Sequence, residues 1–138
     1  MPPAEVVSRQ EWIAANVASL TPLLDPAIAA TKGAAGGSSG GLQLSAAAIV
    51  TVEAGAVLGA MSRKVLGQYD LSLAHGEADP PPRLLFVGPN LGEAAAGMGD
   101  DAADFVRWVA VHEVTHAVQF GAVGWLRDHL GGMAKELI

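Results

Sequence analysis

The segment His112-Glu113-Val114-Thr115-His116 holds the residues best suited to chemistry. Side chains four positions apart share one face of a helix, so His112 and His116 can bind one metal ion between them. Zinc binds imidazole nitrogens at about 2.0–2.1 Å, and a chain without cysteine cannot offer it thiolates. Glu113 points about 100° further round the helix, where a carboxylate can reach a water on the metal without binding the metal. The pattern predicts a Zn²⁺ site with Glu113 as the catalytic carboxylate.

Such a site predicts hydrolysis of a peptide-like bond. Zinc lowers the pKa of its water toward about 7 and polarises the substrate carbonyl. Glu113 can take the proton of that water and deliver it to the leaving amine. The favoured interpretation is therefore a zinc-dependent metallopeptidase that acts on a peptide or protein substrate through a zinc-activated water. Two alternatives stay open: a non-catalytic helical interaction or scaffold protein, and a zinc hydrolase of small amides.

A catalytic zinc normally has three protein ligands besides water. Gln119 and Ala122 stand where the metzincin pattern requires Gly and His, so that class is excluded. The gluzincin pattern takes a Glu from a second helix, roughly 20 residues or more beyond the second His. Glu136 stands there and is the provisional third ligand, with a solvated position in a frayed terminal segment as the other interpretation. His129 and Asp128 are the remaining candidates, Asp128 also as a hydrogen-bond partner of a ligand imidazole.

Composition and charge narrow the function classes. Hydrophobic residues make up 51% and charged residues 16% of the 138 residues, which is typical of one globular domain over residues 1–138. The net charge of −6 and the lack of a basic patch argue against a nucleic acid or a membrane surface as partner. Residues 42–61 resemble a membrane span, but Glu53 inside it would cost roughly 2.5–3.5 kcal/mol, so we expect a buried helix. The N-terminus has no secretory pattern, so a cytoplasmic location is expected.

Helix-capping residues, the spacing of apolar residues, and glycine or proline breaks predict the helices and strands that position the motif. Ser8 and Glu11 form a capping box, which predicts a helix that begins at Arg9. The run 84–87 before Gly-Pro-Asn predicts a strand, which can be a core strand or an edge on which an extended substrate lies. The other expected elements are a helix over 9–19 interrupted by Thr21-Pro22, a short helix over 26–31, a flexible Gly/Ser segment at 33–41, a helix over 45–66 ended by Gly67, the motif helix over 102–120, and a last helix from about 125.

Three further residues could contribute to the site. Trp108 lies one turn before His112 and can pack in the core or wall the metal site. Tyr69 can stabilise an oxyanion, but nothing in the sequence places it near the zinc. Gln119 lies about one turn beyond His116, where it can touch a substrate.

Beyond the motif, the chain resembles a known family. It is similar to bacterial zincin-like proteins described as zinc-dependent metallopeptidases or hydrolases, some of them associated with biosynthesis of the deazaflavin coenzyme. The matching segments are Arg9-Gln10-Glu11-Trp12, Ser62-Arg63-Lys64-Val65-Leu66-Gly67-Gln68-Tyr69-Asp70, Leu84-Leu85-Phe86-Val87-Gly88-Pro89-Asn90, and the run from His112 through Gln119-Phe120 to Trp125-Leu126-Arg127-Asp128-His129-Leu130.

The resemblance implies a mainly α, zincin-like domain with a small β element and the HExxH motif on a central helix. It implies His112 and His116 as zinc ligands and Glu113 as the catalytic carboxylate. Family members are longer, so the resemblance also implies that this chain is the N-terminal part of a longer family domain and forms an incomplete one.

Overall fold

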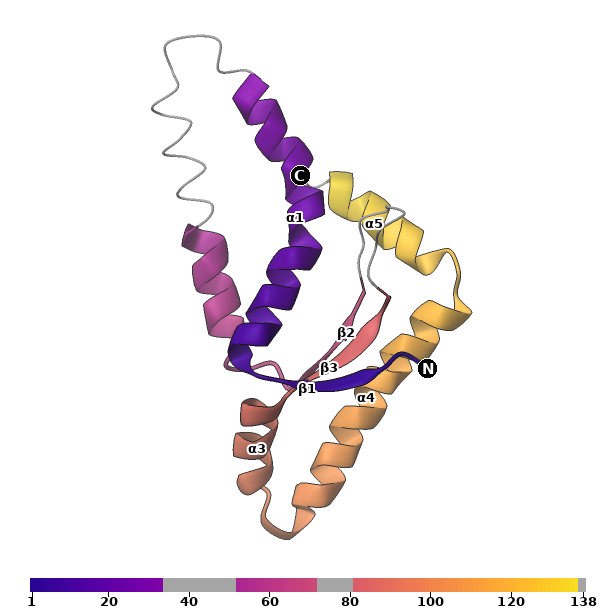
Figure 1. Cartoon of the computed structure of the whole chain (residues 1–138). Coiled ribbons are helices and arrows are strands. Elements are labelled where there is room, and N and C mark those ends of the chain that lie inside the picture. The colour runs from indigo at the N-terminus through magenta and orange to yellow at the C-terminus, as the bar shows by residue number, and fades with distance from the viewer. Residues whose placement is uncertain (34–51, 72–80, 137–138) are drawn as a thin grey trace.

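A computed structural model describes residues 1–33, 52–71 and 81–136. Residues 34–41 of the predicted flexible segment and residues 45–51 of the predicted long helix lie outside these ranges. The described chain is mainly helical with a three-stranded sheet, so the predicted fold class is confirmed (Figure 1). Its elements are β1 (Ala4–Val7), α1 (Arg9–Gly33), a helix over 52–61, β2 (Gly67–Asp70), β3 (Arg83–Val87), α3 (Gly88–Ala96), the 3₁₀ turn η1 (Gly99–Asp101), α4 (Ala102–Ala122) and α5 (Leu126–Glu136).

The sheet is built around β3, in the order β1-β3-β2. β1 runs parallel to β3 with Ala4 opposite Leu84, and β2 runs antiparallel to it with Gly67 opposite Phe86. Leu84, Leu85 and Val87 are buried, the last two completely. Because successive side chains of a strand point to opposite faces, β3 supplies a core to both sides of the sheet. The predicted strand over 84–87 is therefore confirmed, as the central strand.

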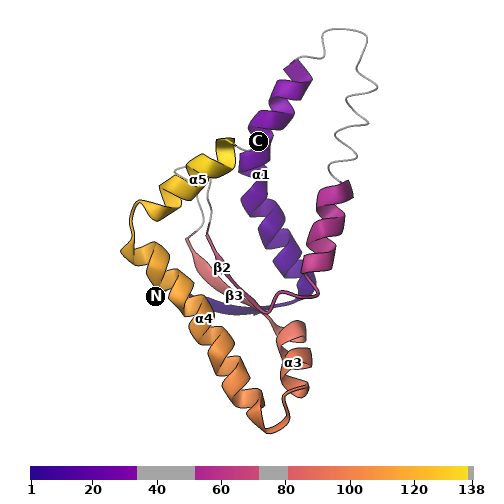
Figure 2. The same ribbon diagram turned by 180° about the vertical axis from the view of Figure 1, so that it is seen from behind.

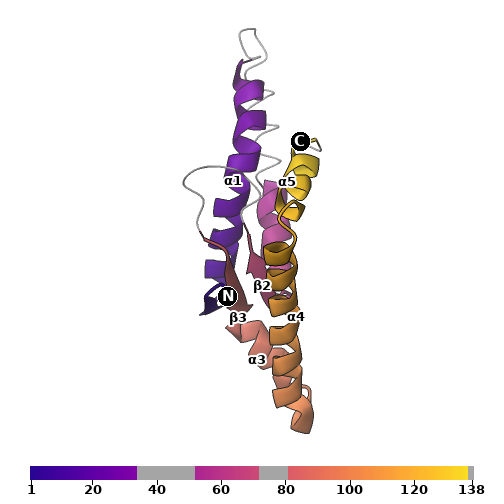
Figure 3. The same ribbon diagram turned by 90° about the vertical axis from the view of Figure 1, so that its right-hand side faces the viewer.

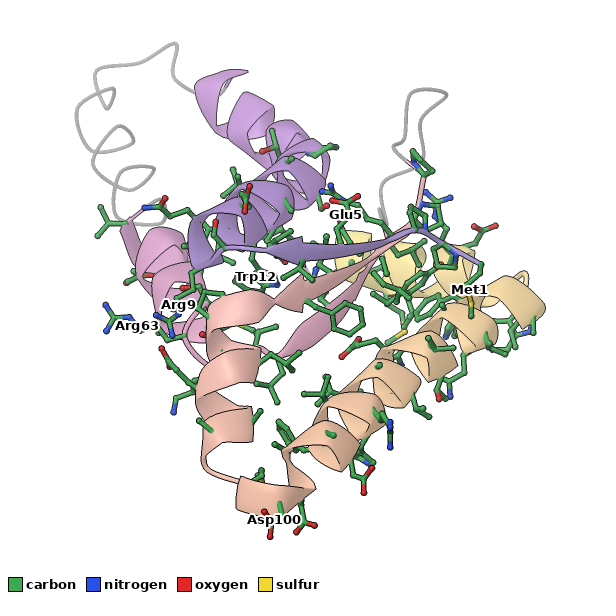
Figure 4. All side chains as sticks on the ribbon, turned by 60° about the horizontal axis from the view of Figure 1, so that its bottom comes forward. Met1, Glu5, Arg9, Trp12, Arg63 and Asp100 are labelled. Atoms are coloured by element: carbon green, nitrogen blue, oxygen red, sulfur yellow. The ribbon has the colours of Figure 1, made fainter. Side chains whose placement is uncertain are left out.

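Helices cover both faces of this small sheet. α1 packs on one face, where Trp12 and Ala15 join Leu85 and Val87 in the core cluster. α4 packs against β2 and β3 on the other face, and the views from behind and from the side show the strands between the two helices (Figures 2 and 3). Figure 4 shows Trp12 between α1 and the strands. As a result, α4, which contains the His112–His116 motif, lies against strand β2.

The start of α1 is as the capping box predicts. The Ser8 N–H donates to Glu11 Oε2 at 2.7 Å, and the Glu11 N–H donates to Ser8 Oγ at 3.2 Å. These hydrogen bonds lower the pKa of the Glu11 carboxyl. The predicted interruption at Thr21-Pro22 is wrong, since the helix continues to Gly33. Pro22 is exposed, so water can satisfy the carbonyl that loses its helical partner, and the flanking turns hold the helix together.

The predicted helix over 45–66 ends earlier than expected, at residue 61. Asn90 Nδ2 donates to the carbonyls of Ser62 and Val65, at 2.8 and 2.7 Å, and the Val87 N–H donates to the Leu66 carbonyl at 3.0 Å. These bonds take carbonyls that a continuing helix would use, so Gly67 begins β2 and does not end a helix.

The helix over 52–61 also differs from the burial predicted for residues 42–61. Val52 and Val57 are exposed, and the helix reaches the core through Leu58. None of the helices that the structure describes is both long enough and apolar enough to cross a membrane.

Asn90 joins three separate parts of the chain. Its side chain is 3% exposed, and besides its two bonds to the 62–65 turn its Oδ1 accepts a hydrogen bond from Arg9 Nε at 2.7 Å. Arg9 also forms an ion pair with Glu93 on α3 at 2.8 Å, and Figure 4 shows Arg9 beside α3. Asn90 therefore fixes the turn that leads into β2 relative to α1 and α3.

We expect Asn90→Ala to lower the free energy of unfolding by about 2–4 kcal/mol, because it leaves buried carbonyls without donors. Urea unfolding followed by circular dichroism measures this loss. Glu93→Ala is the matched control, since it removes only the exposed partner of Arg9 and should cost less than about 1 kcal/mol. Equal small losses in both variants would show that the Asn90 bonds do not hold the turn.

Candidate metal centre

Helix α4 carries the motif along the side that meets the sheet. Residues 102–120 contain no glycine or proline to interrupt the helix, which ends at Ala122. Val109, Glu113 and Ala117 recur every four residues and are its buried residues. Glu113 is only 7% exposed although it is a carboxylate. The predicted motif helix is therefore confirmed, and its packing turns Glu113 toward β2.

His112 and His116 converge on one point. Their Nε2 atoms lie 3.2 Å apart, and their rings are 4.8 Å apart and perpendicular. Two ligands at about 2.0–2.1 Å from a tetrahedral zinc lie about 3.3 Å from each other. The two imidazoles therefore fit two neighbouring positions of a tetrahedral metal ion.

Gln119 orients one of these rings. Its Oε1 lies 3.2 Å from His116 Nδ1, so the His116 tautomer that carries its hydrogen on Nδ1 can donate to this amide oxygen. His116 Nε2 then keeps its lone pair for a metal, an arrangement common around ligand histidines. Sequence reasoning assigned Gln119 to substrate contact and missed this role, although the three-residue spacing from His116 is a signal for it.

The motif opens into a cleft of about 430 Å³ between β2, α4 and α5. Its lining combines the two histidines and Glu113 with apolar side chains. The cleft is lined by Gly67, Gln68, Tyr69, Leu71, His112, Glu113, His116, Phe120 and Leu130. A second hollow of about 320 Å³ on the outer face of α4 is lined by Ala110, Val111, Val114, Thr115 and Val118. It offers no group that binds a metal or moves a proton at neutral pH, so the chemistry belongs to the first cleft.

The third ligand is not brought to the histidines by the residues that the structure describes. Within those residues, no group of three or more His, Cys, Asp or Glu side chains is arranged to hold a metal ion. Glu136 lies exposed at the end of α5, and its role as third ligand stays a prediction. His129 is exposed, and its ring packs against Trp125 at 5.6 Å.

Two interpretations left open by the sequence are now decided. β3 is paired on both edges, so the strand over 84–87 is a core strand, and β2 is an edge strand of the described sheet that contacts α4. Trp108 is 62% exposed and stacks on the His112 ring at 5.5 Å. Trp108 therefore lies beside the proposed metal ligand and is not a core residue.

Tyr69 lines the same cleft as the motif residues. Its ring lies 5.6 Å from that of Phe120 on α4. Burial raises the pKa of the Tyr69 hydroxyl above its ordinary value of 10.0, and the charge of Arg127 opposes part of that rise. Tyr69 therefore keeps its proton at neutral pH and can donate a hydrogen bond into the cleft. The sequence could not predict this position, which depends on how β2 pairs with β3.

Tyr69 is the single tyrosine, so tyrosinate absorbance reports its titration directly. We expect a midpoint above 10.0 in the folded chain and a return to about 10 in urea. Because the pKa of Tyr69 is raised in the folded chain, the protonated hydroxyl contributes to the free energy of unfolding. This contribution is fully present below the unfolded pKa and is lost as pH rises through the folded pKa. Arg127→Gln should raise the midpoint further. A folded midpoint at or below the unfolded one would contradict the burial of this hydroxyl.

Comparison with known proteins identifies the family of the chain. The chain matches the model of a family described as zincin-like metallopeptidase over residues 1–138. No curated protein and no solved structure matches it. The family match spans the sheet, the motif helix and α5 together. The chain therefore belongs to the zincin-like metallopeptidase family.

Proposed function

We propose that the chain is a zinc-dependent metallopeptidase in which His112 and His116 bind zinc and Glu113 is the general base and acid. One observation carries the proposal. The two Nε2 atoms meet at 3.2 Å, in the cleft that also contains the Glu113 carboxylate. We retain Glu136 as the proposed third ligand. Family membership supports the class of reaction.

In this proposal each group in the cleft has a separate chemical role. Zinc supplies a water of lowered pKa and a Lewis acid for the substrate carbonyl. Glu113 accepts the proton of the attacking water and delivers it to the departing amine nitrogen. The Tyr69 hydroxyl donates a hydrogen bond to the carbonyl oxygen as negative charge develops on it.

The shape of the cleft favours a peptide over a small amide. β2 is an edge strand of the described sheet, and an extended peptide can pair with such an edge through backbone hydrogen bonds. Beyond the histidines, the cleft is lined by Phe120 and Leu130, which suit an apolar substrate side chain. We therefore propose unstructured peptides with apolar residues as substrates.

The scaffold alternative explains Glu113 less well. Glu113 is 7% exposed as a residue, but its carboxyl oxygens are not among the buried unpartnered atoms of the described residues, and the side chain lines the cleft. Among the described residues no hydrogen bond or ion pair holds this carboxylate. A carboxylate that has no structural partner and lines the same cleft as the two histidines is available to accept a proton from a water, as a general base must.

Zinc content tests the metal site. We expect about one zinc per chain in the wild type and loss of that zinc in His112→Ala and His116→Ala, measured by elemental analysis after dialysis. Glu93→Ala changes a residue of α3 that does not line the cleft; it is the control and should keep the metal. Loss in Glu136→Ala would identify the third ligand, and retention would place that ligand elsewhere. A wild-type chain without zinc affinity would overturn the proposal.

Glu113→Gln tests the catalytic role. The amide cannot accept the water proton, so we expect cleavage of an unstructured peptide mixture to fall by about 10²–10⁴-fold with zinc retained. Products are followed by mass spectrometry. Glu93→Gln makes the same chemical change on α3, outside the cleft, and should leave activity unchanged. Full activity in Glu113→Gln would exclude Glu113 as the base.

A further inference from the structure

The two faces of β2 have different partners. Gln68 exchanges hydrogen bonds of 3.2 Å with Asn16 on α1, and Asp70 accepts one of 3.3 Å from Ser19. Because side chains alternate along a strand, Gly67 and Tyr69 face the other way, toward α4. The contact between the Tyr69 and Phe120 rings agrees with this alternation. Gly67 is therefore the β2 residue that meets the motif helix at Glu113.

The space at Gly67 is already occupied by Glu113. A Cβ atom added to Gly67 would lie 2.7 Å from Glu113 Cγ and 3.0 Å from both Cδ and Oε1. Real Cβ atoms essentially never approach another atom more closely than 3.0 Å, so a side chain here would require a shift of the Glu113 side chain or of the β2 backbone. At Gly92 on α3, by contrast, an added Cβ would meet nothing within 4 Å.

The glycine is not required by the backbone conformation. The described glycine with a positive φ angle is Gly99, and Gly67 is not in the left-handed region. The requirement at Gly67 is therefore one of space. No described residue bonds the Glu113 carboxylate, so the close approach of the Gly67 backbone is the observed contact that limits where this side chain can lie.

We propose that Gly67 is a positioning residue, which holds the Glu113 carboxylate in place by bringing the β2 backbone into direct contact with it. The catalytic consequence rests on the proposed function; the contact itself does not. An alanine at position 67 pushes the Glu113 side chain away from its place beside His112 and His116. A displacement of about 1 Å in a catalytic group can cost on the order of 10²-fold in rate.

A double-mutant cycle on the metal-free chain tests the contact without any enzyme assay. Gly67→Ala should lower the melting temperature by about 4 °C or more in the wild-type background. In the Glu113→Ala background the crowded atoms are absent, so the same change should have little effect. Gly92→Ala is the matched glycine control and should not depend on residue 113. Equal losses from Gly67→Ala in both backgrounds would overturn the proposal.

Kinetics then test the consequence. Gly67→Ala should lower kcat by about 10²-fold while KM and zinc content stay near wild type, a split that general destabilisation would not produce. Gly92→Ala should keep the wild-type kcat. An unchanged kcat in Gly67→Ala would overturn the positioning role. If the wild type binds no zinc and cleaves no peptide, the proposed function fails, and the melting cycle still decides whether Gly67 positions Glu113.

Discussion

Strand β3 is buried on both faces and paired on both edges, and this constrains the positions of α1, α4 and β2. Leu85 and Val87 are fully buried against Trp12 of α1, and α4 packs on the opposite face. β2 is held to β3 by the antiparallel ladder. The two walls of the cleft, β2 and α4, therefore take their relative position from one strand that contributes no residue to the cleft lining.

Local patterns allowed part of this fold to be predicted. The Ser8–Glu11 box and the uninterrupted run of α4 are recognisable because each depends on residues within a few positions of one another. β1 and β2 were not predicted, since neither Ala-Glu-Val-Val nor Gly-Gln-Tyr-Asp shows a clear alternating apolar pattern. They become strands by pairing with β3. α3 was also missed, because Gly88-Pro89-Asn90 is typical of a turn, although proline is equally suited to a first helical turn.

The candidate site likewise contains some features that local sequence predicts and others that depend on non-local contacts. The convergence of His112 and His116 follows from helical spacing and could be predicted. Tyr69 reaches the cleft only because Asn90 captures the carbonyls of the 62–65 turn and lets the chain enter β2 at Gly67. Gly67 shows the difficulty most clearly, since a glycine after an apolar helical run is a typical helix stop. A third ligand poses the same difficulty, because it must come from a non-local contact.

The parallel pairing of β1 with β3 sets the order in which the molecule can assemble. It joins Ala4 to Leu84, so the first strand leaves the ribosome long before its partner exists. Closing so long a loop costs conformational entropy and slows folding. The antiparallel β2–β3 pair is more local, and α4 follows it in the chain. The cleft can therefore form only after β3, α4 and Leu130 of α5 have been synthesised, and a nascent chain released before β3 is complete would lack the sheet as well as the motif helix.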